Sequence, residues 1–216
     1  MNITYEALKK GCLPASVIHA IMTNKYPQFD HEQSWNGDNF SFIASDARGT
    51  VSFTEKYAVG ALRHDAVAFK RGVDAATLLE GFPEGAKETA EKEAFQYLLT
   101  NENGVTAPSV SFAFYCDSEG IRVNGAEPDR ISELYEILAP FASDVRSALR
   151  HWSIYYGLSL PQRIFALNLL TKKLKDPAKP IVLTKKHMIF FPGDTLCEEC
   201  ICSLGELGIT VSDTEE

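Results

Sequence analysis

The chain has 216 residues, of which 45% are hydrophobic, 23% charged and 11% aromatic, as in an ordinary folded globular protein. Its net charge of −8 disfavours a general nucleic-acid binder, because such proteins carry a basic stripe. The start of the chain lacks the pattern of a signal peptide, and no apolar run is long enough for a transmembrane helix. With five cysteines, an odd number, we expect reduced thiols and a cytoplasmic protein.

The first thirty residues predict two helices. Thr4 is suited to cap a helix that Gly11 would end. Pro14 is suited to the first turn of a second helix, which would run to Pro27.

Residues 39–70 alternate between apolar and polar side chains, with turn residues between the runs. This pattern predicts an antiparallel meander of three or four strands. Its strands are expected at Phe40–Ala44, Val51–Phe53, Tyr57–Ala61 and Val67–Phe69, with turns at Asp46–Gly49, Glu55–Lys56 and His64–Asp65.

The remaining elements are expected to be mostly helical, with three further strand regions. A hairpin is predicted over 109–124, where Asp117–Gly120 forms the turn, and short strands are predicted at Ile181–Leu183, Met188–Phe191 and Ile209–Val211. Helices are expected from Asp74 to Leu79, Glu84 to Thr100, Asp129 to Tyr156 with a kink at Pro140, Leu160 to Leu174, and Asp194 to Leu204.

Strands that cluster along the sequence and are joined by hairpins indicate an α+β fold rather than a doubly wound α/β fold. We therefore expect an antiparallel sheet, built from a meander and hairpins and packed with helices, in a single domain over residues 1–216. The alternative is two subdomains that divide near 101–108.

Cys197, Cys200 and Cys202 form the most prominent candidate cluster for chemistry. A CxxC near a helix start can act in thiol exchange, but Glu198 and Glu199 oppose thiolate formation. A zinc site needs three or four ligands, and His187 is the only histidine nearby in the sequence. We interpret the thiols as structural and expect no metal site and no cofactor, with metal binding and redox exchange as alternatives.

No other motif names a reaction. The five histidines are scattered, and GxSxG, GxGxxG and GxxxxGK[ST] are all absent from the sequence. We assign no catalytic residue on this basis.

The turns of the meander are the best candidates for binding a protein partner. An aromatic residue with arginines and acidic groups on neighbouring loops is typical of a protein–protein hot spot. The candidate residues are Trp35, Asn36, Asp38, Arg48, Arg63, His64 and Asp65. The alternative is that Trp35 only covers the edge of the sheet.

Three stretches of this region, Ser34–Phe40, Arg48–Phe53 and Ala58–Ala61, resemble the immunity proteins of bacterial polymorphic toxin systems. The resemblance implies a small acidic protein that binds and inhibits a cognate toxin encoded nearby. It implies no catalytic residues.

Three functions are therefore considered. We favour a non-enzymatic cytoplasmic binding protein, such as an immunity protein with a protein partner and neither a nucleic acid nor a membrane as its target. The alternatives are an enzyme whose site is assembled from scattered residues, and a structural or regulatory component of an assembly. The sequence leaves the oligomeric state open.

Overall fold

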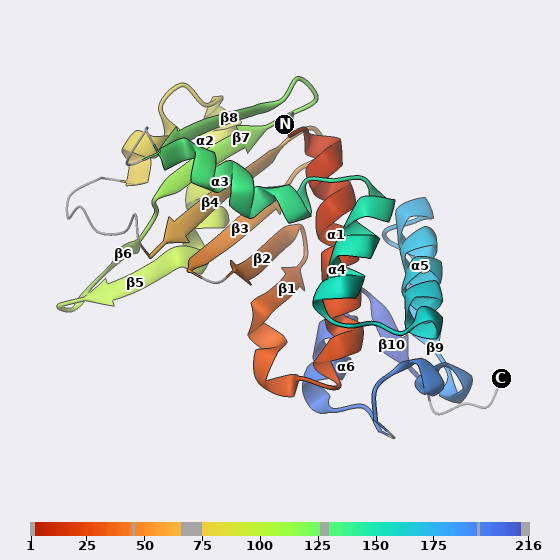
Figure 1. The fold of residues 1–216 in the computed structure, drawn as a ribbon. Helices are drawn as coiled ribbons and strands as arrows, with labels where there is room; N and C mark the ends of the chain where they lie inside the picture. Colours follow the sequence, from red (N-terminus) through yellow and green to blue (C-terminus); the bar gives the residue numbers. More distant parts are fainter. Residues whose placement is uncertain (1–2, 45, 66–74, 126–129, 194, 213–216) are drawn as a thin grey trace. The chain divides into compact units, whose positions relative to one another are not determined.

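A computed structural model describes residues 3–44, 46–65, 75–125, 130–193 and 195–212. It confirms the α+β fold, in which an antiparallel sheet is packed with helices (Figure 1). Among the described residues, no helix combines the length and the apolar character needed to cross a membrane.

The chain divides into two compact units according to its internal contacts. Unit 1 comprises Met1–Lys9 and Asp38–Ala142, and unit 2 comprises Lys10–Gly37 and Ser143–Glu216. Residues 101–108, where the sequence suggested a boundary, lie inside unit 1. The helix α1 (Tyr5–Thr23) contributes its first residues to unit 1 and the rest to unit 2.

Unit 1 is built on an antiparallel sheet whose strands lie in the order β2-β3-β4-β7-β8. Its strands are β2 (Asn39–Ala44), β3 (Ala47–Phe53), β4 (Ala58–His64), β5 (Leu99–Glu102), β6 (Val105–Pro108), β7 (Phe112–Cys116) and β8 (Ile121–Gly125). Its helices are η2 (Ala75–Leu79), α2 (Glu84–Lys92), η3 (Ala94–Leu98), α3 (Ile131–Leu138) and η5 (Ala139–Phe141), where η marks a 3-10 helix. The β2-β3-β4 meander and the β7–β8 hairpin confirm the two predicted strand clusters.

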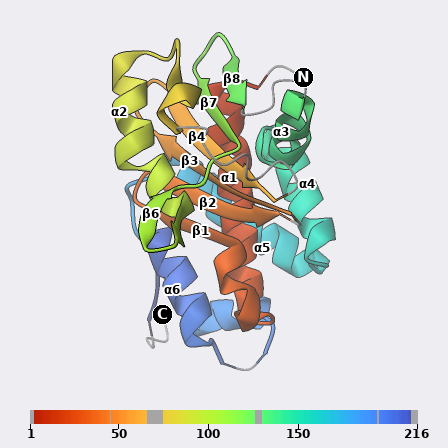
Figure 2. The same ribbon diagram turned by 90° about the vertical axis from the view of Figure 1, so that its left-hand side faces the viewer.

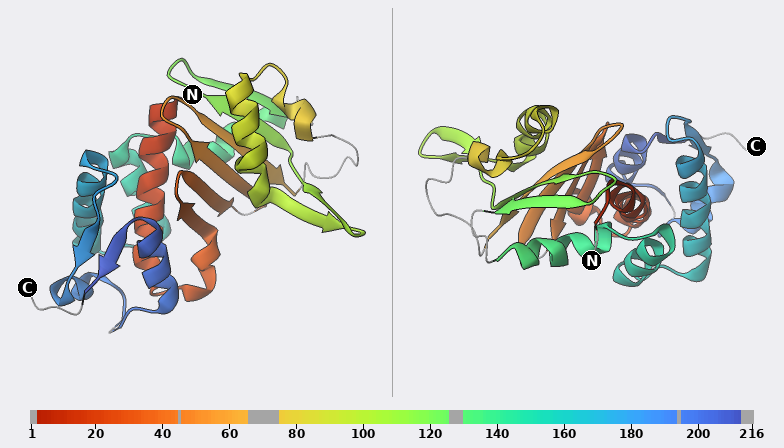
Figure 3. Two further views of the ribbon diagram at one scale, coloured as in Figure 1. Left: turned by 180° about the vertical axis from the view of Figure 1, so that it is seen from behind. Right: turned by 90° about the horizontal axis from the view of Figure 1, so that it is seen from above.

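The alternation of side chains gives this sheet two different faces. On one face Val59, Ala61 and Ala113 pack against the apolar side of η2, α2 and η3. On the opposite face Phe40 and Phe42 pack against Phe141 of η5, with ring centroids 5.4 and 4.3 Å away. Figures 2 and 3 show α2 and α3 on opposite sides of the sheet.

Glycines in two strands make room for phenylalanine rings on the second face. A Cβ on Gly60 would lie 2.1 Å from the ring of Phe114 and 2.6 Å from the backbone oxygen of Thr50. A Cβ on Gly49 would lie 2.3 Å from the ring of Phe42. These contacts fill the gaps that strand glycines otherwise leave in a sheet.

Unit 2 is mostly helical and contains a small parallel sheet. Besides most of α1 it holds η1 (Pro27–Glu32), β1 (Gln33–Asn36), α4 (Val145–Tyr155), α5 (Leu160–Lys175), β9 (Ile181–Leu183), η6 (Lys185–Phe190), α6 (Glu198–Glu206) and β10 (Ile209–Val211). Strands β9 and β10 pair in parallel, from Ile209 with Ile181 to Val211 with Leu183.

The expected strand at Met188–Phe191 is wrong, because η6 occupies most of it. Thr184 and His187 form a capping box that starts this 3-10 helix. The strand that pairs with β9 is instead β10, which follows α6 in the sequence. The two strands are parallel, so a crossover that includes α6 connects them.

The predicted break near Gly11 is also wrong, since α1 runs through both Gly11 and Pro14. A glycine and a proline inside a helix cost about 1 and 3 kcal/mol relative to alanine. The helix buries Leu8, Val17 and Ile18 completely, and this packing outweighs the local preference.

Two predicted long helices are interrupted. The helix expected from Glu84 to Thr100 ends at Glu93, whose φ of −121° and ψ of −72° are not helical, and the chain continues as η3 and β5. Ala90, Ala94 and Leu98 of this stretch are buried, whereas Tyr97 is 38% exposed.

The helix expected from Asp129 to Tyr156 is divided into α3, η5 and α4. Pro140 lacks a backbone N–H and so cannot continue the hydrogen bonding of α3. The Asp144 side chain starts α4 as its N-cap, because it accepts hydrogen bonds from the backbone N–H groups of Arg146 and Ser147. The expected strand at Val67–Phe69 and the expected caps Asp74 and Asp194 lie outside the described residues.

Candidate functional site

The structure assigns the predicted partner-binding residues to both units. Trp35 and Asn36 belong to unit 2, and Asp38, Arg48, Arg63, His64 and Asp65 belong to unit 1. Within unit 1, Arg48 pairs with Arg63, whereas Asp38 precedes the end of β2 that pairs with Ser52. Four residues of strand separate Arg48 from Ser52, about 13 Å. The structure thus brings Arg48, Arg63, His64 and Asp65 to one end of the strands, with His64 on the opposite face from Arg63, and leaves Asp38 at the other end.

Trp35 is held in place by bonds within unit 2. Its indole Nε1 donates to the backbone oxygen of Gly37 at 2.8 Å, and its backbone N donates to Glu206 Oε2 at 3.0 Å. Burial raises the pKa of the Glu206 carboxyl. The half-buried indole therefore stabilises the turn at Gly37 through its hydrogen bond.

Arg48 and Arg63 were expected on corner loops, and this is wrong, because they lie within β3 and β4. The turn is shorter than predicted, since Ala44 already pairs with Ala47. Two positive side chains directly across a strand pair repel each other. Asp65 Oδ1 lies 3.4 Å from Arg63 Nε and reduces this repulsion.

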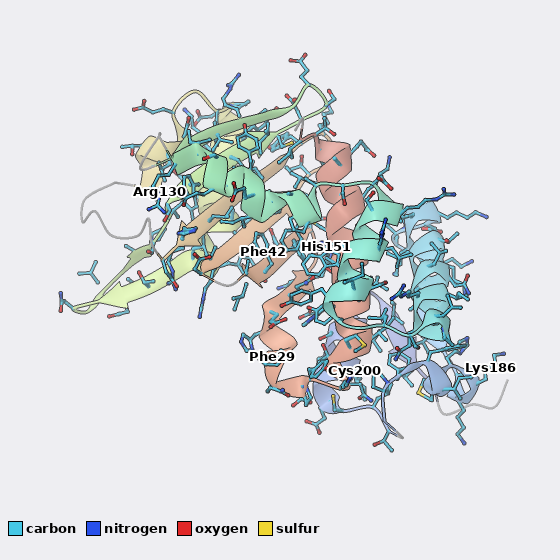
Figure 4. All side chains as sticks on the ribbon, viewed as in Figure 1. Phe29, Phe42, Arg130, His151, Lys186 and Cys200 are labelled. Atoms are coloured by element: carbon cyan, nitrogen blue, oxygen red, sulfur yellow. The ribbon has the colours of Figure 1, made fainter. Side chains whose placement is uncertain are left out.

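His64 lies in an ionic cluster on the other face of β4. Its Nε2 is 3.4 Å from Asp46 Oδ2 and 3.6 Å from Glu133 Oε2. Arg130, at the start of α3 in Figure 4, donates to both oxygens of Glu133 at 2.6 and 2.8 Å. The Ser111 hydroxyl accepts a bond from the backbone N of His64 at 3.1 Å.

This cluster links His64 of β4 to Asp46, in the turn before β3, to Ser111, which precedes β7, and to Glu133 of α3. The Ser111 hydroxyl bonds to the backbone N and O of His64 rather than to its imidazole. A serine nucleophile needs a hydrogen bond to its base, and this pair does not provide one. Sequence reasoning missed Glu133 and Arg130 because only the fold brings them to His64, about seventy residues away along the chain.

A second polar network is buried in unit 2 around the hydroxyl of Tyr156. His19 Nδ1 lies 2.8 Å from this hydroxyl, Gln33 Nε2 donates to it at 3.2 Å, and Glu32 Oε2 lies 3.3 Å away. His19 Nε2 is 3.1 Å from the backbone oxygen of Asp30. A carbonyl only accepts, so His19 Nε2 carries a proton. The Tyr156 hydroxyl has a single proton, for which Glu32 Oε2 and His19 Nδ1 are the two acceptors within reach.

Burial lowers the pKa of His19 and raises that of Tyr156. Both groups are therefore neutral near pH 7, and the network is suited to fixing α1, β1 and α4 rather than to transferring protons.

The cysteine cluster packs against the end of α1. Cys200 Sγ donates to the Ala20 backbone oxygen at 3.2 Å, and Cys197 Sγ donates to that of Thr23 at 3.8 Å. Burial raises the pKa of Cys200 to about 12 and also raises that of Cys197. Neutral thiols that bond to helix carbonyls are poor nucleophiles. Among the described residues, no three His, Cys, Asp or Glu side chains are grouped to hold a metal ion.

A different feature stands out on α5, which lies beside α4 in unit 2 (Figures 1 and 3). Its inner side buries Phe165, Ala166, Leu169 and Leu170. Its outer side carries a second apolar row, which stays exposed among the residues that the structure describes. This row, the α5 stripe, consists of Leu160, Ile164, Leu167 and Leu174, which are 68%, 53%, 41% and 39% exposed.

The α5 stripe lies in a basic part of an acidic chain. Residues 145–175 contain no Asp or Glu but six basic side chains, namely Arg146, Arg150, Arg163, Lys172, Lys173 and Lys175. Lys173 is buried and donates to the backbone oxygens of Pro177 and Lys179, while the others on α5 are exposed.

No family model matches the chain, and comparisons with curated proteins and with solved structures find no match.

Proposed function

We propose that this chain is a non-enzymatic binding protein that acts by docking a protein partner on the α5 stripe. The observation that carries the proposal is the row of four exposed aliphatic side chains on one side of a well-formed helix. Exposed apolar residues are common singly, but a continuous row is typical of an interaction surface.

The two polar networks favour binding over catalysis. The side chains around His64 and Tyr156 are engaged with one another, and the His19 and Tyr156 pKa shifts keep both groups neutral. A catalytic acid or base would instead be expected to have a pKa shifted toward the working pH.

An immunity protein is one form of this proposal, in which the partner is a toxin. The proposed compartment is the cytoplasm, which suits the five free thiols of the chain. In this form the residues around Arg48, Arg63 and Asp65 would supply a second, polar contact.

Affinity purification from the native host tests the proposal. The tagged chain is compared with an Ile164→Ser, Leu167→Ser double variant and with an Ile189→Ser control. Ile189 is 80% exposed on η6, so the control removes an even more accessible apolar side chain from another element of unit 2.

We expect a protein that copurifies with the wild type and with Ile189→Ser but not with the double variant. The proposal is wrong if no stable partner copurifies, or if the double variant retains every partner.

A further inference from the structure

The α5 stripe has the spacing of a coiled-coil seam. Leu160, Ile164, Leu167, Thr171 and Leu174 follow one another at intervals of four, three, four and three residues. In heptad notation the three leucines occupy d positions, and Ile164 and Thr171 occupy a positions. The row is about 21 Å long at 1.5 Å per residue.

Two positions that flank the seam carry positive charge, and the other three flanking positions, Pro161, Asn168 and Leu170, are uncharged. In the same register Arg163 occupies a g position and Lys175 an e position, one on each side of the stripe, and both are exposed. Side chains at e and g face those of a partner helix and select its charge. No acidic residue within α4 or α5 neutralises them.

We infer that the partner presents an acidic amphipathic helix, with Leu or Ile along its seam and Glu or Asp at the flanking positions. The seam supplies the apolar contact, and Arg163 and Lys175 supply the charge complementarity. This inference rests on the proposed function and names the chemistry of the partner at the same site.

A second copy of the chain fits the stripe less well. Every charged side chain of α5 is positive, so pairing α5 with its own copy brings only like charges together.

An anionic membrane also fits less well, because interfacial helices bury a broad apolar face. The broad apolar face of α5 is already occupied by Phe165, Leu169 and Leu170 packing inward. The exposed row is one residue wide, which suits the interlocking side chains of a helix pair.

Fluorescence anisotropy with two labelled peptides tests the inference on the full chain. Both peptides have three heptads with Ile at a and Leu at d, and they differ only in carrying Glu or Lys at e and g. We expect the Glu peptide to bind at least about tenfold more tightly than the Lys peptide, with the difference decreasing at high salt.

Two variants assign the binding to the stripe. Ile164→Ser with Leu167→Ser should abolish binding of the Glu peptide, and Arg163→Glu with Lys175→Glu should reverse the preference toward the Lys peptide. Circular dichroism of each variant confirms that it is folded, and the charge-reversal variant keeps the stripe itself intact.

Three outcomes would overturn the inference. They are equal binding or no binding of the two peptides, stripe-dependent binding to vesicles that contain anionic lipid, and a dimer in light scattering that Ile164→Ser dissociates. If peptide binding fails while the purified partner still depends on the stripe, the proposed function stands and only the acidic helix is wrong.

Discussion

Ile164 and Leu170 of α5 provide a matched pair for testing whether the stripe faces solvent. Leu170 is fully buried, so Leu170→Ala should lower the free energy of unfolding by about 2–5 kcal/mol. Ile164 is 53% exposed, so truncation loses only about half of its burial, about 1 kcal/mol. Alanine forms helix better than isoleucine by about 0.4 kcal/mol, which leaves a net loss of about 0.6 kcal/mol.

Urea denaturation followed by circular dichroism measures both values, and an unchanged slope shows that the two variants unfold like the wild type. If Ile164→Ala lost as much stability as Leu170→Ala, Ile164 would be buried in solution. The stripe would then be part of the fold or of a self-association interface, and the proposed docking surface would not exist.

Three further predictions test the packing and the polar groups. Gly60→Ala should lower the free energy of unfolding by about 3 kcal/mol, because the new Cβ meets a backbone oxygen as well as Phe114. Gly205→Ala, which has open space around its Cβ, should not lower it. A small loss at Gly60 would contradict the described packing. Burial lowers the pKa of His19 in the folded state, so the unfolded chain binds a proton more readily than the folded chain. The free energy of unfolding should therefore keep its full value above pH 6.5 and decline below that pH. His19→Gln should flatten that decline in pH-dependent unfolding, and an unchanged slope would show that another group titrates. A zinc chelator should leave the thermal midpoint unchanged, since the Cys197 and Cys200 thiols bond to α1; a clear drop in a melting scan would instead indicate a bound metal.

Local signals explain what could be predicted from the sequence. The β2-β3-β4 meander and the β7–β8 hairpin are joined by short turns, so alternation and turn residues within one segment were sufficient. The helix α5 was predicted from Leu160 to Leu174, with Pro161 in its first turn, and it ends at Lys175.

Nonlocal packing explains what could not be predicted. Gly11 and Pro14 have poor helix propensity, but burial along α1 decides their conformation. The partner of β9 lies beyond another helix, and the partners of His64 come from distant segments. Such contacts are created by the fold and leave no pattern within a short window.

The α5 stripe was visible in the sequence but could not be interpreted from it. Two apolar rows run along α5, one through Leu169 and one through Leu167. Periodicity shows that both exist, and only the packing shows which of them is buried.

Site-specific photo-crosslinking in the native host tests whether a protein partner docks on the α5 stripe. A photoreactive amino acid replaces Leu167 in the stripe, or Ile189 on η6 as the exposed control. We expect a discrete heavier band, containing one partner protein, from position 167 but not from position 189. A chain that stays uncrosslinked at 167, or that forms the same band from both positions, would contradict the claim that α5 docks a partner.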